Sequence, residues 1–133
     1  MWTPLSARSI FFAALLILTV ASCRAVTIYN VENYSLNASP NATMEDVESA
    51  IKRAGAGLGW HIKSVSPGIL EARLTIRRHL AVTAIRYDTK VFSINYREST
   101  NLKYNMTDKT IHSNYVGWVQ NLQKAILAEA SKI

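Results

Sequence analysis

The single cysteine, Cys23, stands where its thiol can act as a nucleophile. It follows an apolar run, Ile10–Val20, that is broken only by Thr19, and Arg8 places a positive charge ahead of this run. A run of this length is too short to cross ~30 Å of hydrocarbon as a helix, which takes about 20 residues. It suits the hydrophobic region of a secretory signal peptide instead. We therefore predict that residues 1–22 are a signal peptide.

The residues before Cys23 resemble a lipobox. Val20, Ala21 and Ser22 are a branched apolar residue followed by two small ones, which let the backbone enter a peptidase groove. The Cys23 thiol would take up diacylglycerol, and several acyl chains anchor stably because each buried CH₂ contributes about 0.8 kcal/mol. Residue 24 is Arg rather than Asp, which by resemblance to Gram-negative lipoproteins favours the outer membrane. A plain secretory signal and an uncleaved anchor are the alternatives.

Length and composition indicate one small domain. The chain has 133 residues and a formal charge of +6, and removal of Arg8 with the signal peptide leaves about +5. A lone cysteine excludes an internal disulfide. A mildly basic surface can attract anionic lipid or a polyanion, although many small basic domains bind neither.

We find no catalytic set and expect no cofactor. None of the three histidines has another histidine four residues away, and no second cysteine exists, so no metal site is expected. Glu45, Asp46 and Glu48 fall near the start of a predicted helix, where carboxylates favour the N-terminus rather than acid–base work. We predict that the protein is not an enzyme.

Two helices are predicted. The first begins at Thr43 with a near capping box, and its end is expected at Gly55, Gly57 and Gly59. The second spans about residues 111–130 and carries an apolar stripe at helical spacing. That stripe comprises Ile111, Tyr115, Trp118, Val119, Leu122 and Ile126.

Four runs between the helices alternate apolar and polar residues or are rich in β-formers, at residues 60–66, 69–77, 80–87 and 91–98. We predict an α+β domain over residues 43–133. It has an N-terminal helix, a three- to four-stranded antiparallel meander and a C-terminal helix, with both helices on one sheet face. Residues 23–42 are rich in Asn, Ser and Ala, and we expect the lipidated cysteine and a flexible tether there.

The hairpin register is predicted from the apolar pattern. We expect Ile76 opposite Ala81 across one tight turn and Tyr87 opposite Phe92 across the next. Both pairings turn the odd-numbered residues of 80–87 inward.

The same register places Glu71 opposite Arg86 on the outer face as a cross-strand ion pair. The outer face is also expected to gather basic side chains, either as a polyanion platform or as a solvated face with local ion pairs. It lacks the aromatic interleaving of RNA-binding sheets, so no nucleic acid partner is expected. The basic residues are Arg73, Arg77, Arg86 and Arg97.

Residues 96–118 form the densest polar and aromatic segment, and such loops often carry binding. Five side chains are candidates to line a groove where sheet and helix meet. Alternatively, they fill the core and cap the last helix. The candidates are Asn101, Tyr104, His112, Asn114 and Trp118.

This segment resembles a family of small uncharacterised proteobacterial lipoproteins. The family pattern is S-x-N-L-x-Y followed by I-H-x-N-Y-x-x-W. The runs that match it here are Ser99–Tyr104, Thr110–Tyr115 and Trp118–Leu122. Here Val116-Gly117 replaces an Asn and a polar residue that the family usually carries. The resemblance covers roughly residues 43–128 and implies fold and location, not activity.

The sequence thus predicts a periplasm-facing outer-membrane lipoprotein held by lipid on Cys23. Its domain is expected to be a non-catalytic binding module for an envelope protein or cell-wall component. The alternative is a structural or assembly accessory of an envelope protein complex.

Overall fold

The computed structural model describes residues 24–133, so the predicted signal peptide and Cys23 lie outside the described residues. Strands and helices follow one another along this part of the chain. In order they are β1 (Ala25–Thr27), β2 (Val31–Ser35), α1 (Met44–Gly57), β3 (His61–Ser66), β4 (Ile69–Ile76), β5 (His79–Tyr87), β6 (Val91–Thr100), β7 (Thr110–His112) and α2 (Ser113–Ala130).

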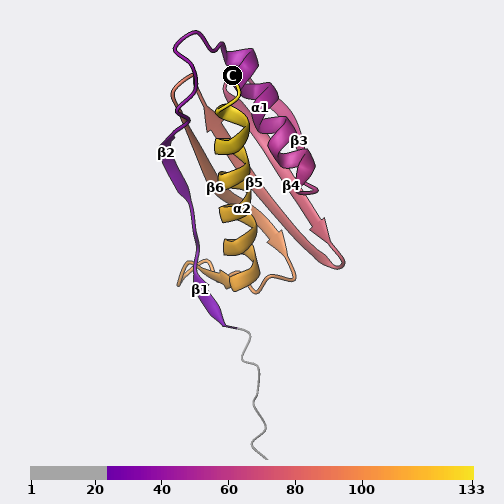
Figure 1. Cartoon of the computed structure of the whole chain (residues 1–133). Coiled ribbons are helices and arrows are strands. Elements are labelled where there is room, and N and C mark those ends of the chain that lie inside the picture. Colours follow the sequence, from indigo (N-terminus) through magenta and orange to yellow (C-terminus); the bar gives the residue numbers. More distant parts are fainter. Residues whose placement is uncertain (1–23) are drawn as a thin grey trace, which may run out of the picture.

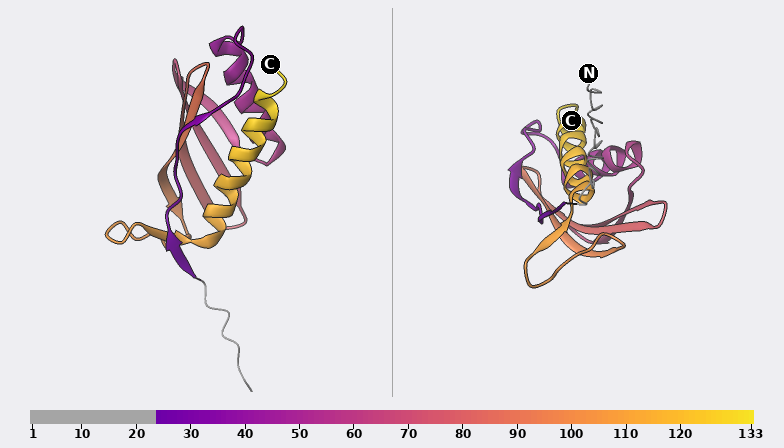
Figure 2. Two further views of the ribbon diagram at one scale, coloured as in Figure 1. Left: turned by 60° about the vertical axis from the view of Figure 1, so that its left-hand side comes forward. Right: turned by 90° about the horizontal axis from the view of Figure 1, so that it is seen from below.

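Five strands form one antiparallel sheet in the order β2-β6-β5-β4-β3, and β1 and β7 form a small second sheet. Both helices lie on the same face of the large sheet (Figures 1 and 2). The α+β class is therefore confirmed. The sheet has more strands than the three to four predicted, because β2 joins its edge.

The core lies between this sheet face and the two helices. Leu70, Ala72 and Leu74 alternate inward along β4, as the pattern predicts. The helices close over them with side chains spaced three and four residues apart. The fully covered ones are Val47 and Ile51 on α1, and Tyr115, Val119, Leu122 and Ile126 on α2.

The predicted tether over residues 23–42 is wrong where the structure describes it. Ala25 of β1 pairs with His112 of β7, and Val31 of β2 pairs with Ile94 of β6. Val31 and Leu36 are buried in the core. Asn33, one of the polar residues that suggested a linker, lies at a bulge of this edge strand with φ 46°.

The predicted β4–β5 register is wrong by two residues. Ile76 pairs with His79, and Leu74, not Ile76, pairs with Ala81. A shift of two leaves every side chain on its own face, so the inward set of β5 is confirmed despite the error. The pairing of Tyr87 with Phe92 is also confirmed.

The predicted Glu71–Arg86 pair does not form. Arg86 lies opposite Ile69, and Glu71 lies opposite Ala84. The Glu71 carboxylate accepts from Arg73 Nε at 2.9 Å instead. This correction follows directly from the register shift.

The helix ends are partly as predicted. Thr43 and Asp46 form the capping box, with the Thr43 N–H donating to Asp46 Oδ2 at 2.8 Å and the Asp46 N–H to Thr43 Oγ1 at 3.1 Å. Gly55 and Gly57 lie inside α1 rather than beyond it. The second helix begins at Ser113, because Ile111 is held in β7 by Val26.

The burial of β2 predicts that its residues contribute to stability. Val31→Ala should lower the free energy of unfolding by about 2 kcal/mol, from lost transfer energy and an unfilled cavity. The matched control is Val65→Ala on β3, where Val65 is 61% exposed against 3% for Val31. Chemical denaturation measures both. Equal effects of the two changes would show that β2 is not part of the core.

Substitution of alanine for two glycines inside helices should change the stability of the fold in opposite directions. A Cβ at Gly55 would lie 2.2 Å from Ile62 Cδ1 and 3.3 Å from Trp60 Cβ, whereas a Cβ at Gly117 meets nothing within 4 Å. Gly55→Ala should therefore destabilise the fold by about 1–3 kcal/mol through overpacking. Gly117→Ala should stabilise it by about 0.5–1 kcal/mol through helix propensity. Thermal unfolding tests the difference, and a gain from both changes would contradict the packing of α1 on β3.

Candidate functional site

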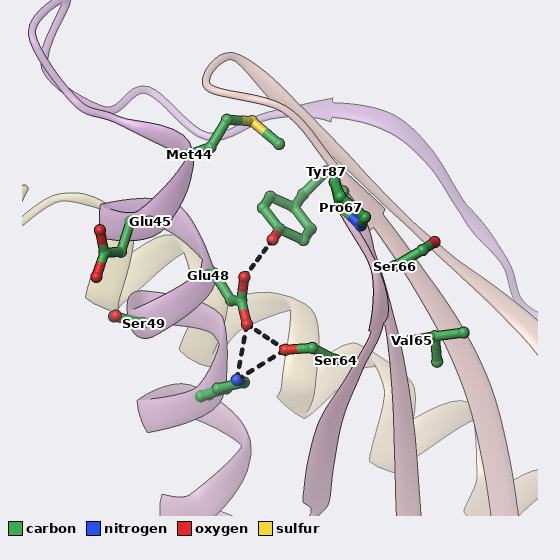
Figure 3. Close-up of a pocket in the computed structure, with 11 residues that line it drawn as sticks. Met44, Glu45, Glu48, Ser49, Ser64, Val65, Ser66, Pro67 and Tyr87 are labelled. Atoms are coloured by element: carbon green, nitrogen blue, oxygen red, sulfur yellow. Dashed lines mark hydrogen bonds and ion pairs between the residues drawn. The ribbon is translucent and has the colours of Figure 1, made fainter.

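The largest hollow described lies between the first turns of α1 and the β3–β4 hairpin. It has a volume of about 700 Å³. Its walls come from α1, from β3 and its turn, and from the end of β5 (Figure 3). The start of α1 and the β3–β4 turn, which line it, lie at the end of the molecule opposite β1 (Figure 1). We call it the α1–β3 groove.

Local structure accounts for the polar side chains of the α1–β3 groove. Glu48 and Lys52 are four residues apart on α1, so they share one helix face. Ser64 faces α1 because it pairs with inward-facing Leu70 on the neighbouring strand. Tyr87 ends β5, and its N–H donates to the carbonyl of Gly68 at 3.0 Å, which holds it against the hairpin turn.

The Glu48 carboxylate accepts hydrogen bonds from three side chains (Figure 3). Lys52 Nζ lies 2.7 Å from Oε1, and the Tyr87 hydroxyl donates to Oε2 at 2.7 Å. The Ser64 hydroxyl also donates to Oε1. Lys52 Nζ donates to Ser64 Oγ at 2.9 Å, which closes the network.

This network keeps Glu48 ionised. Hydrogen bonds from Lys52, then from Ser64 and Tyr87, lower the pKa of Glu48 from 4.5 to about 2. Burial, and then the hydrogen bond to Glu48, raise the pKa of Tyr87 to about 12. Tyr87 therefore stays a neutral donor and Glu48 a fixed anion at physiological pH.

A serine beside a lysine suggests nucleophilic catalysis, but the charges oppose it. To act as a base, Lys52 must offer a lone pair, and an ammonium has none. Lys52 Nζ lies 2.7 Å from Glu48 Oε1 and donates to Ser64 Oγ at 2.9 Å, so it acts here as a donor to both groups. The α1–β3 groove therefore offers fixed polar groups beside an apolar rim, where Met44 is 39% and Val65 61% exposed.

The predicted binding residues have different structural roles. Asn101 Nδ2 donates to the Arg78 carbonyl at 2.7 Å, which fastens the end of β6 to the β4–β5 turn. His112 caps α2, because its Nδ1 accepts from the Asn114 N–H at 3.1 Å. Trp118 is half-buried against the core.

Tyr104, the fifth candidate, belongs to an aromatic cluster. Its ring stacks on Tyr96 with centroids 4.2 Å apart, and Tyr96 meets the buried Tyr115 edge-on at 5.6 Å. Asn101, His112 and Tyr104 therefore make separate hydrogen-bond and aromatic contacts, and none of the five candidates lines the α1–β3 groove. Their role in binding stays a prediction.

The arginines of the outer sheet face do not act as one group. Arg73 is paired, with Nε 2.9 Å from Glu71 and Nη2 3.3 Å from Glu98. Arg77 lies in the β4–β5 turn with φ 55°. Only Arg86 and Arg97 share a hollow on this face, with a volume of about 170 Å³.

Within residues 24–133, no group of three or more His, Cys, Asp and Glu side chains is placed to hold a metal ion. In the same part of the chain, neither helix has the length and apolarity needed to cross a membrane.

Comparisons with known proteins found no match: no family model fits the chain, and no curated protein or solved structure is similar to it. The resemblance of residues 99–122 to a lipoprotein family stays a prediction.

Sequence reasoning missed the α1–β3 groove. Glu48 was expected to favour the helix N-terminus, yet it lies beyond the capping residues and points to the sheet. Its spacing from Lys52 is visible in the sequence. The convergence of Ser64 and Tyr87 on the same carboxylate depends on the packing of α1 against β3 and β5.

Loss of the Glu48 charge should weaken the fold in a pH-dependent way. Because the folded pKa lies below the ordinary one, the network stabilises the fold above about pH 4.5, and this is lost as the pH falls towards 2. Glu48→Gln should cost about 1–2 kcal/mol at pH 7, since hydrogen bonds to a partly exposed charge are lost. Chemical denaturation at pH values from 7 to 2 should show that the difference in free energy of unfolding between Glu48→Gln and the wild type decreases as the pH falls.

Glu45→Gln is the matched control. Glu45 lies on the same helix and lines the same groove, but it forms no ion pair within residues 24–133. Its neutralisation should change stability by less than about 0.5 kcal/mol. A Glu48→Gln effect that stays constant with pH would contradict the ionised network.

Proposed function

We propose that this protein is a periplasm-facing outer-membrane lipoprotein, anchored by lipid on Cys23, whose domain binds an envelope component without catalysing a reaction. The lipobox-like run Val20–Cys23 supports the anchor. The resemblance to small proteobacterial lipoproteins belongs to the same proposal.

The observation that carries the proposal is that the first described strand begins just after Cys23. Ala25, two residues after Cys23, already pairs with His112, and Ile28 N donates to the Lys109 carbonyl at 2.8 Å. Cleavage before Cys23 would leave all of the described strands and helices intact. An acylated Cys23 would then hold the domain against the bilayer, with no long linker between them.

The α1–β3 groove is the surface we propose for binding. The elements that line it lie at the end opposite β1, so a domain anchored beside β1 would hold the groove away from the membrane (Figure 1). Met44 and Val65 offer apolar contacts, and Lys52 and Ser64 offer polar ones. The ligand class that suits this lining is an envelope component with an apolar group next to a hydrogen-bonding group.

Absence of catalysis is part of the proposal. Its support is that the Ser64 hydroxyl donates to Glu48, and a carboxylate whose pKa is lowered to about 2 is a weak base.

An assembly accessory is the second candidate, and the position of β3 favours it. β3 forms one edge of the large sheet, and five of its six residues are exposed. An edge strand can pair with a strand of a partner protein.

Removal of the Cys23 thiol tests the anchor. In a Gram-negative host, the wild-type chain should fractionate with the outer membrane, and mass spectrometry should find acyl chains on an N-terminal Cys23. Cys23→Ser should abolish acylation and release the protein from that fraction, since serine cannot form the thioether. Ser22→Ala, which keeps a small residue before the cysteine, is the matched control and should remain acylated. Wild-type protein that carries a free thiol at Cys23 would contradict the proposal.

A further inference from the structure

One end of the domain gathers basic side chains. The segments 24–28, 76–79 and 101–112 contain five lysines and arginines and only one carboxylate, Asp108. All five basic residues are exposed, and within residues 24–133 none forms an ion pair. They are Arg24, Arg77, Arg78, Lys103 and Lys109. We call this surface the basic end.

A continuous series of contacts builds the basic end from segments distant in sequence. His79 Nδ1 lies 2.9 Å from the Asn101 carbonyl oxygen, and the His112 N–H donates to the Leu102 carbonyl at 2.8 Å. β7 then pairs with β1, where the described chain begins. Figures 1 and 2 show β1, the start of α2 and the 103–109 loop at this end.

Three of the five cations occupy unusual backbone positions. Arg77, Lys103 and Lys109 have φ values of 55°, 53° and 52°. This left-handed region favours Gly and Asn, and long side chains are uncommon there. Because the three side chains are exposed, core packing does not account for the choice of residue.

The opposite end of the domain carries the other sign. Glu45 and Asp46 lie in the first turn of α1, and Asp88 lies at the β5–β6 turn, with Lys90 beside it. Charge is thus polarised along the molecule. The positive end is the one at which Arg24 follows Cys23.

We propose that the basic end rests on the anionic phospholipid headgroups of the membrane that holds Cys23. This inference depends on the proposed lipid anchor, which would bring this end to the bilayer. Each cation close to an anionic surface strengthens the attraction about fivefold, within a Debye length of about 10 Å. Met106, 72% exposed in the loop between Lys103 and Lys109, adds an apolar side chain to the contact.

The arrangement of the cations favours a membrane surface over a small anion as the binding partner. The five residues come from three separate segments, and none of them lines a hollow described above. A free phosphate would need donors that converge on one point, whereas spread cations match a plane of headgroups.

Amide hydrogen exchange on the mature lipidated protein tests this contact. The protein is placed in phosphatidylcholine vesicles with or without about one third phosphatidylglycerol. Exchange in residues 101–110 should slow at least about fivefold with the anionic lipid, and about 1 M salt should remove the difference because it screens charge. Equal exchange in both vesicles, or equal slowing by dissolved inorganic phosphate, would overturn the proposal.

Two triple variants with the same change in net charge make the test specific. Arg78→Gln, Lys103→Asn and Lys109→Asn together should abolish the lipid-dependent slowing, and asparagine suits the left-handed positions. The control is a set of exposed cations away from the basic end, which should leave the slowing unchanged. It comprises Arg86→Gln, Lys90→Asn and Lys124→Gln.

Failure of the anchor is distinguishable from failure of the contact. If Cys23 carries no acyl chain, the proposed anchor fails. The same purified chain can then be sedimented with the two kinds of vesicle. Retention only by anionic vesicles, lost in the first triple variant, would still support the contact, and no retention by either would overturn it.

Discussion

One row of side chains on the inner face crosses the whole sheet, and the rest of the structure depends on its burial. Val31, Ile94, Ile85, Leu70 and Ser64 lie next to one another on five successive strands. The first four are at most 3% exposed. Burial of such side chains contributes roughly 1.5–3 kcal/mol each, which holds the strands under α1 and α2. The row begins in β2 and ends at the α1–β3 groove.

The polar network around Glu48 lies at the end of this apolar row. Ser64 occupies an inward position at the sheet edge, and the hydroxyl of Tyr87 reaches the same carboxylate from the end of β5. A carboxylate beside a core is costly unless donors surround it, and Glu48 has three. The same contacts that make Glu48 compatible with the fold keep it charged. They also support our proposal that the groove binds a ligand and does not carry out acid–base chemistry.

The two ends of the domain suit different surroundings. The basic end contains the start of the described chain and is joined by backbone hydrogen bonds between β1, β7 and the end of β6. The α1–β3 groove lies at the other end, beside the carboxylates of α1. Our proposals of a lipid anchor, a headgroup contact and a ligand groove are therefore geometrically compatible: a domain held at the basic end leaves the groove accessible.

The sequence by itself determined the features that depend on neighbours along the chain. The Thr43 capping box and the apolar stripe of α2 follow from spacing along the chain, because a helical backbone repeats every 3.6 residues. The inward set of β5 follows from the two-residue alternation of an extended backbone together with its pairing to the neighbouring strands. The β4–β5 register required more, since a slip of two residues preserves that alternation. Only the tertiary structure placed β1 on β7, β2 on β6, and Ser64 and Tyr87 on Glu48. Those partners lie far apart in sequence, so their pairing depends on which surfaces the complete core brings together.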